Sequence, residues 1–112
     1  MTLDRSLTAG STTTLVLKLL EARDMYGYEM IEALAERSEG AFALKAGTLY
    51  PLLHGLEREG LVSAYERRAD GDRVRRYYHL TADGARLLAE KEREWREFSG
   101  AVDRVLNGGA GA

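Results

Sequence analysis

Residues 47–80, GTLYPLLHGLEREGLVSAYERRADGDRVRRYYHL, decide the fold, because they join an amphipathic helix directly to a β-hairpin. The helix buries leucines at the i, i+3, i+4, i+7 spacing of one helix face, namely Leu49, Leu52, Leu53 and Leu56. Pro51 lies in the first turn, where its missing N–H costs nothing, and Gly60 ends the helix. The other face carries groups that can contact something outside: Thr48, Tyr50, Pro51, His54, Gly55 and Arg58.

The hairpin follows this helix at once. Residues 61–67 and 74–80 predict its two strands, and the Asp70-Gly71 pair between them favours a tight turn. Alternation along the second strand gives it two faces, with Leu80, Tyr78 and Arg76 on one and His79, Tyr77 and Arg75 on the other.

Two further helices are predicted before this stretch. The first, over residues 11–22, starts with Ser and Thr side chains that can cap it. The second, over residues 28–38, carries an apolar stripe at helical spacing, and residues 24–27 form a turn between the two. Phe42 and Leu44 alternate with their neighbours and predict a very short strand.

This order of elements predicts a mainly α protein with a winged helix-turn-helix fold over residues 11–80. A three-helix core would carry a two-stranded β wing, and the second and third helices would form the helix-turn-helix unit. Residues 1–10 are expected to be a flexible N-terminal arm, and residues 107–112 a flexible tail.

The last helix, expected within residues 81–106, predicts a homodimer. Its apolar side chains fall at the a and d positions of a seven-residue repeat, with Lys91 at the remaining d: Leu88, Trp95, Phe98, Val102 and Val105. A small domain cannot fold this whole stripe onto its own core, so we expect a second subunit to cover the half from Trp95 to Leu106. The alternative is that the stripe packs on the first helix of its own chain.

Composition narrows the function. The 112 residues suit one domain with a modest core, and the absence of cysteine excludes disulfides, thiolate zinc sites and a cysteine nucleophile. His54 and His79 have no carboxylate cluster at ligand spacing, so neither a metal site nor a cofactor is expected. We find no phosphate loop, nucleophile elbow, membrane span or signal peptide, and therefore expect a cytoplasmic protein that is not an enzyme.

The net charge of −2 hides an uneven distribution. Residues 21–40 carry six acids and two bases, whereas residues 61–80 carry three acids and five arginines: Arg67, Arg68, Arg73, Arg75 and Arg76. Like charges crowded on one hairpin repel, so an anionic partner is a natural reason for them, and phosphate pairs well with arginine. Asp70 and Asp72 leave open a hairpin that is merely salt-bridged.

The third helix fits the major groove of double-stranded DNA. Thr48, Tyr50 and His54 supply hydrogen-bonding groups near its start, and Lys45 just before it can neutralise a phosphate. The alternative is an ordinary solvent-exposed polar face.

Four motifs together resemble the PadR family of transcriptional regulators over residues 12–88. They are YGYE (26–29), AGTLYPLL (46–53), LEREGLV (56–62) and RYYHLTADG (76–84). The single short C-terminal helix is similar to the smaller branch of that family. The resemblance implies a homodimeric winged-helix repressor that binds a palindromic operator and is often released by a small molecule.

The resemblance also implies site residues. Carried over by position, the DNA-facing helix would present Thr48, Tyr50, Pro51 and His54, and the wing would contact DNA through Arg73, Arg75 and Arg76. Trp95 lies where some relatives stack a flat aromatic effector between subunits, and Phe98 is its neighbour on the helix.

Two other functions stay open beside the repressor. One is a sensor whose main activity is binding flat aromatic or cationic ligands at Trp95. The other is a protein-interaction winged helix without a DNA role, in which the hairpin arginines bind an acidic partner.

Overall fold

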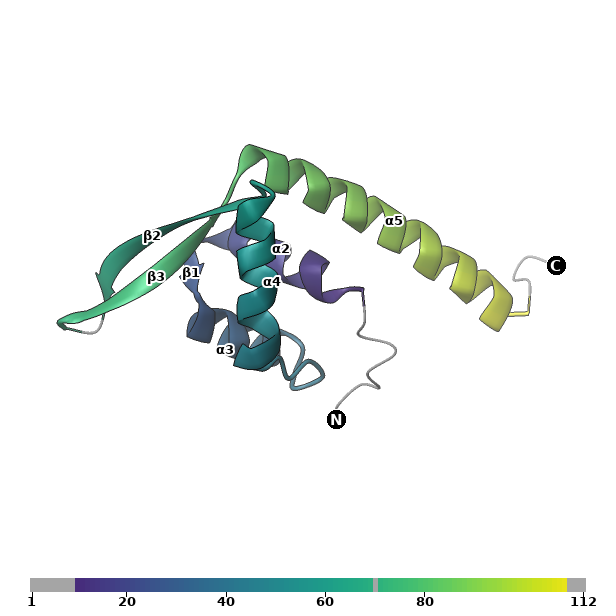
Figure 1. Cartoon of the computed structure of the whole chain (residues 1–112). Coiled ribbons are helices and arrows are strands. Elements are labelled where there is room, and N and C mark those ends of the chain that lie inside the picture. Colours follow the sequence, from purple (N-terminus) through teal and green to yellow (C-terminus); the bar gives the residue numbers. More distant parts are fainter. Residues whose placement is uncertain (1–9, 70, 109–112) are drawn as a thin grey trace.

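A winged helix-turn-helix domain and one long helix that leaves it make up the computed structural model, which describes residues 10–69 and 71–108 (Figure 1). In chain order the elements are α2 (Thr12–Ala22), β1 (Met25–Tyr26), α3 (Gly27–Arg37), α4 (Ala46–Arg58), β2 (Val62–Ala69), β3 (Arg73–Leu80) and α5 (Ala82–Leu106). The molecule measures 62 × 31 × 21 Å, because α5 extends well beyond the domain. The fold class predicted from the sequence is confirmed.

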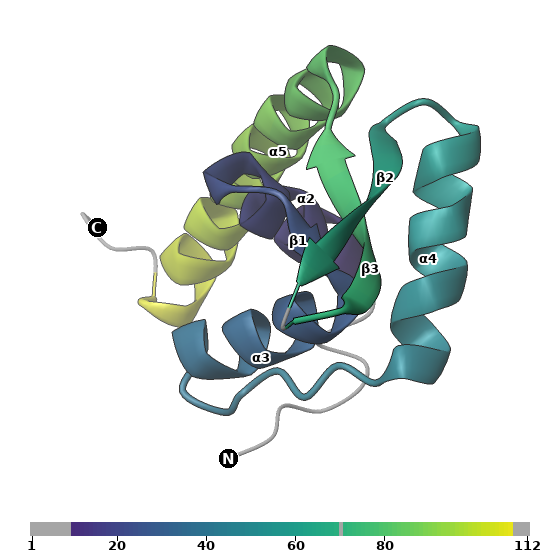
Figure 2. The same cartoon turned by 90° about the vertical axis from the view of Figure 1, so that its left-hand side faces the viewer.

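The core lies where α2, α3 and α4 meet the sheet and the first turns of α5. Turned by 90°, Figure 2 shows α2 behind the sheet, with α4 on one side of it and α5 on the other. The buried side chains come from every layer: Val16, Leu17, Leu19, Leu20, Met25, Met30, Leu34, Leu49, Leu53, Leu56, Val62, Tyr78 and Leu88. Three of the four predicted α4 leucines are among them, and Leu52 is partly buried beside the cluster.

The sheet has three antiparallel strands in the order β1-β3-β2. Val62 of β2 lies opposite Leu80 of β3, and the pairing runs without a bulge to Ala69 opposite Arg73. Gly71 at the turn has a φ of +78°, a left-handed conformation that glycine adopts without strain. The predicted wing and the two faces of its second strand are therefore confirmed.

The structure corrects two local predictions. Met25 and Tyr26 are not part of a turn but form β1, which pairs with Tyr78 and Tyr77 of β3. Two residues are too few to show a strand period, and their pairing partner lies about fifty residues away. The predicted strand around Phe42 and Leu44 is wrong, because residues 42–45 form no strand and the Phe42 N–H donates to the Ser38 hydroxyl instead.

Helix α4 ends as the sequence predicts. Gly60 has a φ of +75°, and the N–H groups of Gly60 and Leu61 donate to the carbonyls of Glu57 and Leu56. This turn leads the chain directly into β2, so the base of the wing is fixed to the end of α4.

Helix α5 begins and ends close to its predicted limits and docks on the domain through its first half. Thr81 caps it by accepting a hydrogen bond from the Gly84 N–H at 3.1 Å. Gly84 is buried so closely against the Leu61 carbonyl that no side chain fits between them. Further along, Glu92 forms an ion pair with Lys18 of α2 at 3.2 Å. The first half of the helix thus belongs to the domain.

The expected flexible arm at residues 1–10 and tail at residues 107–112 lie mostly outside the described residues. Gly10 and residues 107–108 are described, as parts of turns next to α2 and α5. In the described part of the chain, no helix is long and apolar enough to span a membrane.

Candidate nucleic-acid interface

Helix α4 presents the polar face that the sequence predicts. Lys45, Thr48, Pro51 and His54 are all exposed, while the opposite side of the helix is buried in the core. Lys45 also caps the helix through its backbone carbonyl, which accepts the N–H groups of Thr48 and Leu49. The helix therefore offers a solvent-facing row of donors and acceptors on a rigid support.

Tyr50 is placed differently from the other α4 residues. It is 39% exposed, and its ring lies against the Gly27 backbone, where α3 begins. A Cβ atom at Gly27 would overlap the Tyr50 hydroxyl and ring. Tyr50 therefore spans the two helices of the helix-turn-helix unit, a role that no local pattern in the sequence reveals.

The wing is tied to α4 by an ion pair. The Arg76 guanidinium donates to both carboxylate oxygens of Glu57, at 3.0 and 2.8 Å. The pKa of Arg76 is raised, chiefly by this contact with Glu57. The sequence predicts Arg76 as a wing contact, and the structure gives that side chain an intramolecular partner on α4.

The outer face of the sheet is a tyrosine cluster. Tyr77 is buried although it points away from the core, because Tyr26 packs edge-on against its ring at 5.4 Å and Tyr65 stacks on it at 5.7 Å. Two arginines cover these rings, with the Cζ atom of Arg67 4.3 Å from the Tyr77 ring and that of Arg75 4.9 Å from the Tyr26 ring. Alternation predicts the direction of Tyr77 but not its burial, which depends on β1.

An acid at the edge of this cluster anchors the base of the wing. Asp24 accepts a hydrogen bond from the Tyr65 hydroxyl at 2.6 Å, and its other oxygen lies 2.9 Å from His79 Nδ1. Burial acts to raise the pKa of Asp24, but the hydrogen bonds from Tyr65 and His79 outweigh it and lower that pKa. The same contact raises the pKa of Tyr65. His79 is therefore a structural partner of a carboxylate.

The alternative interpretation of the wing, as a hairpin whose arginines are paired with its own acids, is confirmed in part. Arg68 pairs with Asp72 across the turn at 3.4 Å, whereas Arg73 is exposed near the tip. Asp70 lies outside the described residues. Within the part of the chain that the structure describes, no group of His, Asp and Glu side chains could hold a metal ion.

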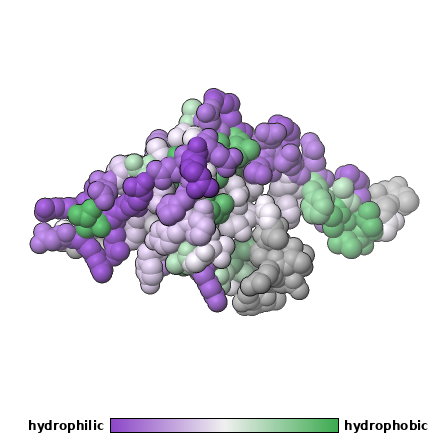
Figure 3. Space-filling model, viewed as in Figure 1, coloured by the Kyte–Doolittle hydropathy of each residue, from purple (hydrophilic) through white to green (hydrophobic). Residues whose placement is uncertain are grey.

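The second half of α5 carries an exposed apolar surface. Figure 3 shows a hydrophobic patch over the end of the helix, away from the domain. Its exposed residues are Trp95, Phe98, Val105 and Leu106, and the Trp95 and Phe98 rings lie 6.0 Å apart. Leu88 is only 1% exposed and packs in the core of its own chain, so its predicted place in a dimer surface is corrected.

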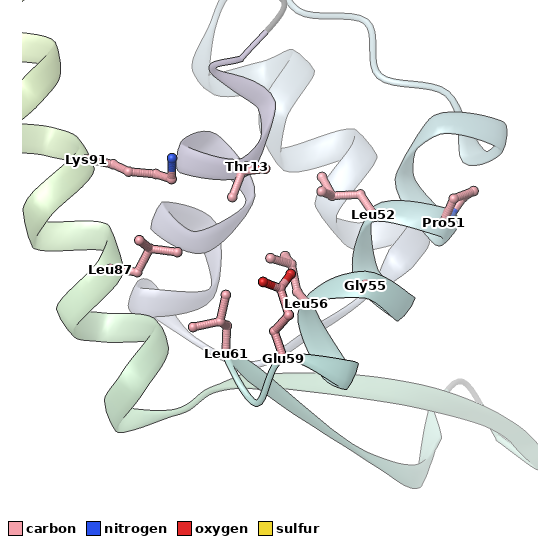
Figure 4. Close-up of a pocket in the computed structure, with 9 residues that line it drawn as sticks. All are labelled: Thr13, Pro51, Leu52, Gly55, Leu56, Glu59, Leu61, Leu87 and Lys91. Carbon is pink, nitrogen blue, oxygen red and sulfur yellow. The ribbon is translucent and has the colours of Figure 1, made fainter.

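An open cleft of about 380 Å³ separates α4 from α5 (Figure 4). Leu52 and Leu56 line it from α4, and Leu87 and Lys91 from α5. Thr13 closes one side from α2. No sequence pattern predicted this cleft, because it forms where three helices far apart in the chain meet loosely.

Comparison with known proteins agrees with this geometry. Residues 16–90 match the model of the Transcriptional regulator PadR-like family. The chain belongs to the PadR-like family. The match includes α4, the whole wing and the start of α5, so it covers every part of the candidate interface except the end of α5.

Several transcriptional regulators are similar to most of this chain. The PadR family transcription regulator from Clostridium difficile is 33% identical, with a TM-score of 0.77 over 87% of this chain and 99% of that one. The corresponding regulator from Eggerthella lenta is 34% identical, with a TM-score of 0.79 over 90% of this chain and 86% of that one. The transcriptional regulator Rv3488 of Mycobacterium tuberculosis is 40% identical over 60% of this chain and 62% of its own length.

Proposed function

We propose that this PadR-like regulator is a repressor that binds a palindromic operator in double-stranded DNA as a homodimer. The observation that carries the proposal is the exposed polar face of α4, held on a buried leucine stripe and flanked by an arginine-rich wing. Such a helix fits the major groove, while the wing fits the adjacent backbone.

Base reading would fall to α4. Thr48 and His54 are both exposed on α4 and can exchange hydrogen bonds with base edges. Pro51 lies between them in the sequence, and Lys45, which precedes them, can neutralise a phosphate beside the groove. Tyr50 would act through its position on Gly27, because it fixes how α4 sits on α3.

Two-fold pairing would come from α5. Trp95 and Phe98 are 57% and 62% exposed in the single chain, which is costly for aromatic side chains that lie together. A second α5 would cover them along with Val102 and Val105, and it would set the two α4 helices at a fixed separation.

Release by an effector would use the same surface. We propose that a flat aromatic molecule stacks on Trp95 and Phe98 between the subunits. A change in the packing of α5 could then reach α4 across the cleft, since Leu87 and Lys91 of α5 face Leu52 and Leu56 there. Quenching of the fluorescence of the single tryptophan measures such binding, and unchanged emission across a broad ligand panel would refute it.

The deciding experiment is selection of genomic fragments by the purified protein. A repressor of this kind enriches a palindrome whose half-sites lie one helical turn, about 34–36 Å, apart. His54→Ala should then weaken binding to the selected site more than binding to unrelated duplex, while Glu90→Gln on the exposed side of α5 should change neither. Failure to enrich any sequence would refute the proposal.

A further inference from the structure

The arginines on the two faces of the wing have different kinds of partner. On the face turned towards the core, Arg76 pairs with Glu57 of α4 and Arg68 pairs with Asp72. Each of these guanidinium groups already has a carboxylate partner. This face of the wing therefore presents little uncompensated positive charge.

On the outer face, Arg67 of β2 lies directly opposite Arg75 of β3. Cross-strand partners have Cβ atoms about 4.5–5.5 Å apart, and like charges in that relationship are destabilising. Within the described residues, neither guanidinium forms an ion pair. Asp24 acts on Arg67 electrostatically, but Tyr65 and His79 occupy its two oxygens.

Tyrosine rings hold this unfavourable pair in place. Arg67 lies over Tyr77 and Arg75 over Tyr26, and the two rings pack edge to face. The Nε atom of Arg75 is buried and has no hydrogen-bond partner among the described residues, so the ring contact, not a hydrogen bond at that atom, positions this side chain. The Tyr77 side chain also forms a hydrogen bond with Arg67. A cation held by neutral tyrosines keeps its full charge and its remaining donors, whereas a carboxylate partner would neutralise the charge.

We propose that Arg67 and Arg75 form a clamp for a single phosphate group, supplied by the DNA backbone. Two planar guanidinium groups on neighbouring strands can both donate to the oxygens of one phosphate, which would also relieve their mutual repulsion. The proposal rests on the proposed function, because the phosphate belongs to the bound duplex. It adds Arg67 to the interface and makes Arg76 a residue that positions the wing.

The salt dependence of duplex binding tests the clamp. Each phosphate neutralised on B-DNA contributes about 0.9 to the slope of log K against log salt. A dimer carries one clamp in each subunit, so Arg67→Gln with Arg75→Gln should reduce the slope by about 1.8 per bound dimer, and the two single effects on affinity should not be additive. A reduction of about 3.6 with additive single effects means two separate phosphates on each wing and overturns the clamp.

A matched control separates the clamp from a general loss of charge. Arg68→Gln with Arg86→Gln also removes two positive charges, one from the opposite face of the wing and one from α5. Both of these arginines are paired with an aspartate. This control should leave the slope nearly unchanged. If it matches the Arg67/Arg75 variant, or if that variant keeps the parent slope while remaining folded by circular dichroism, the clamp is overturned.

Arginine Nε–H resonances give a readout that does not depend on operator binding. Titration with duplex, and separately with inorganic phosphate, should shift the Arg67 and Arg75 signals together along one saturable curve, and Arg67→Gln should weaken the response of Arg75. If the parent protein binds no duplex, the proposed function fails, and the phosphate titration alone decides the clamp. Signals that stay fixed in phosphate would then overturn it.

Discussion

Arg76 on β3 and Glu57 on α4 form a two-pronged ion pair, with donor–acceptor distances of 3.0 and 2.8 Å. This contact joins the wing to the helix proposed to read the bases, at a point near the shared turn at Gly60. This ion pair and the turn at Gly60 therefore join the two parts of the proposed interface into one unit.

Glu57→Gln should separate this unit without unfolding it. Surface ion pairs stabilise proteins by less than about 1 kcal/mol, so the melting temperature should fall only slightly. The released Arg76 charge should strengthen binding to unrelated duplex, while the loosened wing weakens operator binding, so the ratio of the two affinities should drop several-fold. Anisotropy titrations on both duplexes measure this ratio, and an unchanged ratio would contradict the positioning role.

Asp24→Asn should alter stability in a pH-dependent way. The folded-state pKa of Asp24 is lowered from 3.8, so its contribution is fully present above that value and is lost as pH falls through the lower folded pKa. The free energy of unfolding of the parent should therefore exceed that of the variant by about 1 kcal/mol at about pH 5. This difference should narrow below about pH 3.8. Urea melts across this range measure the gap.

Asp72→Asn serves as the control for this pH series. The Asp72 side chain is fully exposed near the wing tip and contacts only Arg68 in the described contacts. Its substitution should leave stability nearly constant over the same range. A gap that persists unchanged at low pH for Asp24→Asn would refute the assignment.

Two glycines of α5 should respond oppositely to alanine. A methyl group at Gly84 meets the Leu61 backbone, which cannot move aside, so Gly84→Ala should destabilise the protein by about 2–3 kcal/mol. Gly100 has only the end of Arg104 nearby, so Gly100→Ala should stabilise the helix by about 0.5–1 kcal/mol. Thermal melts compare the two, and equal effects would show that the close approach at Gly84 does not constrain α5.

Gly27→Ala should act mainly on function. The added methyl group displaces the hydroxyl end of the Tyr50 side chain, which is 39% exposed and can swing away, so the loss of stability should stay at about 1 kcal/mol. Operator affinity should fall as much as in Tyr50→Ala, and the double variant should be no worse than either single one. Additive losses of affinity would show that Gly27 and Tyr50 act separately.

Trp95→Glu with Phe98→Glu should yield folded monomers. Both side chains lie beyond the docked part of α5, so the winged-helix domain should keep its circular dichroism spectrum and unfold cooperatively. Sedimentation velocity should show the loss of the dimer, and operator affinity should fall by at least tenfold because two half-sites are no longer bound together. A variant that stays dimeric would place the subunit contact elsewhere.

Local periodicity predicted most of this fold, and long-range pairing accounts for what it missed. The leucine stripe of α4 and the Asp-Gly turn of the wing are repeated or local signals, and both appear in the structure. Strand β1 has two residues, and only its pairing with Tyr77 and Tyr78 makes it a strand. No single-sequence pattern contains that information.

The candidate site could likewise be predicted only where local patterns determine it. Exposure of Thr48 and His54 follows from the helix period. The contacts of Tyr50 with Gly27 and of Arg76 with Glu57 depend on how whole elements pack, and the sequence spacing alone does not reveal them. The a and d repeat of α5 also misplaced Leu88, because a heptad pattern does not distinguish the subunit's own core from a partner.

The joint between Gly84 and Leu61 bears on how such a regulator could acquire new targets. The 25 residues of α5 span about 37 Å, so a tilt of about 10° at its base displaces its far end by about 6 Å. In a two-fold assembly that displacement would alter the distance between the two DNA-reading heads, while leaving the bases that each head recognises unchanged. Substitutions at this joint would therefore be an evolutionary route to a new spacer length between half-sites. Substitutions on α4 would be a separate route to a new half-site sequence.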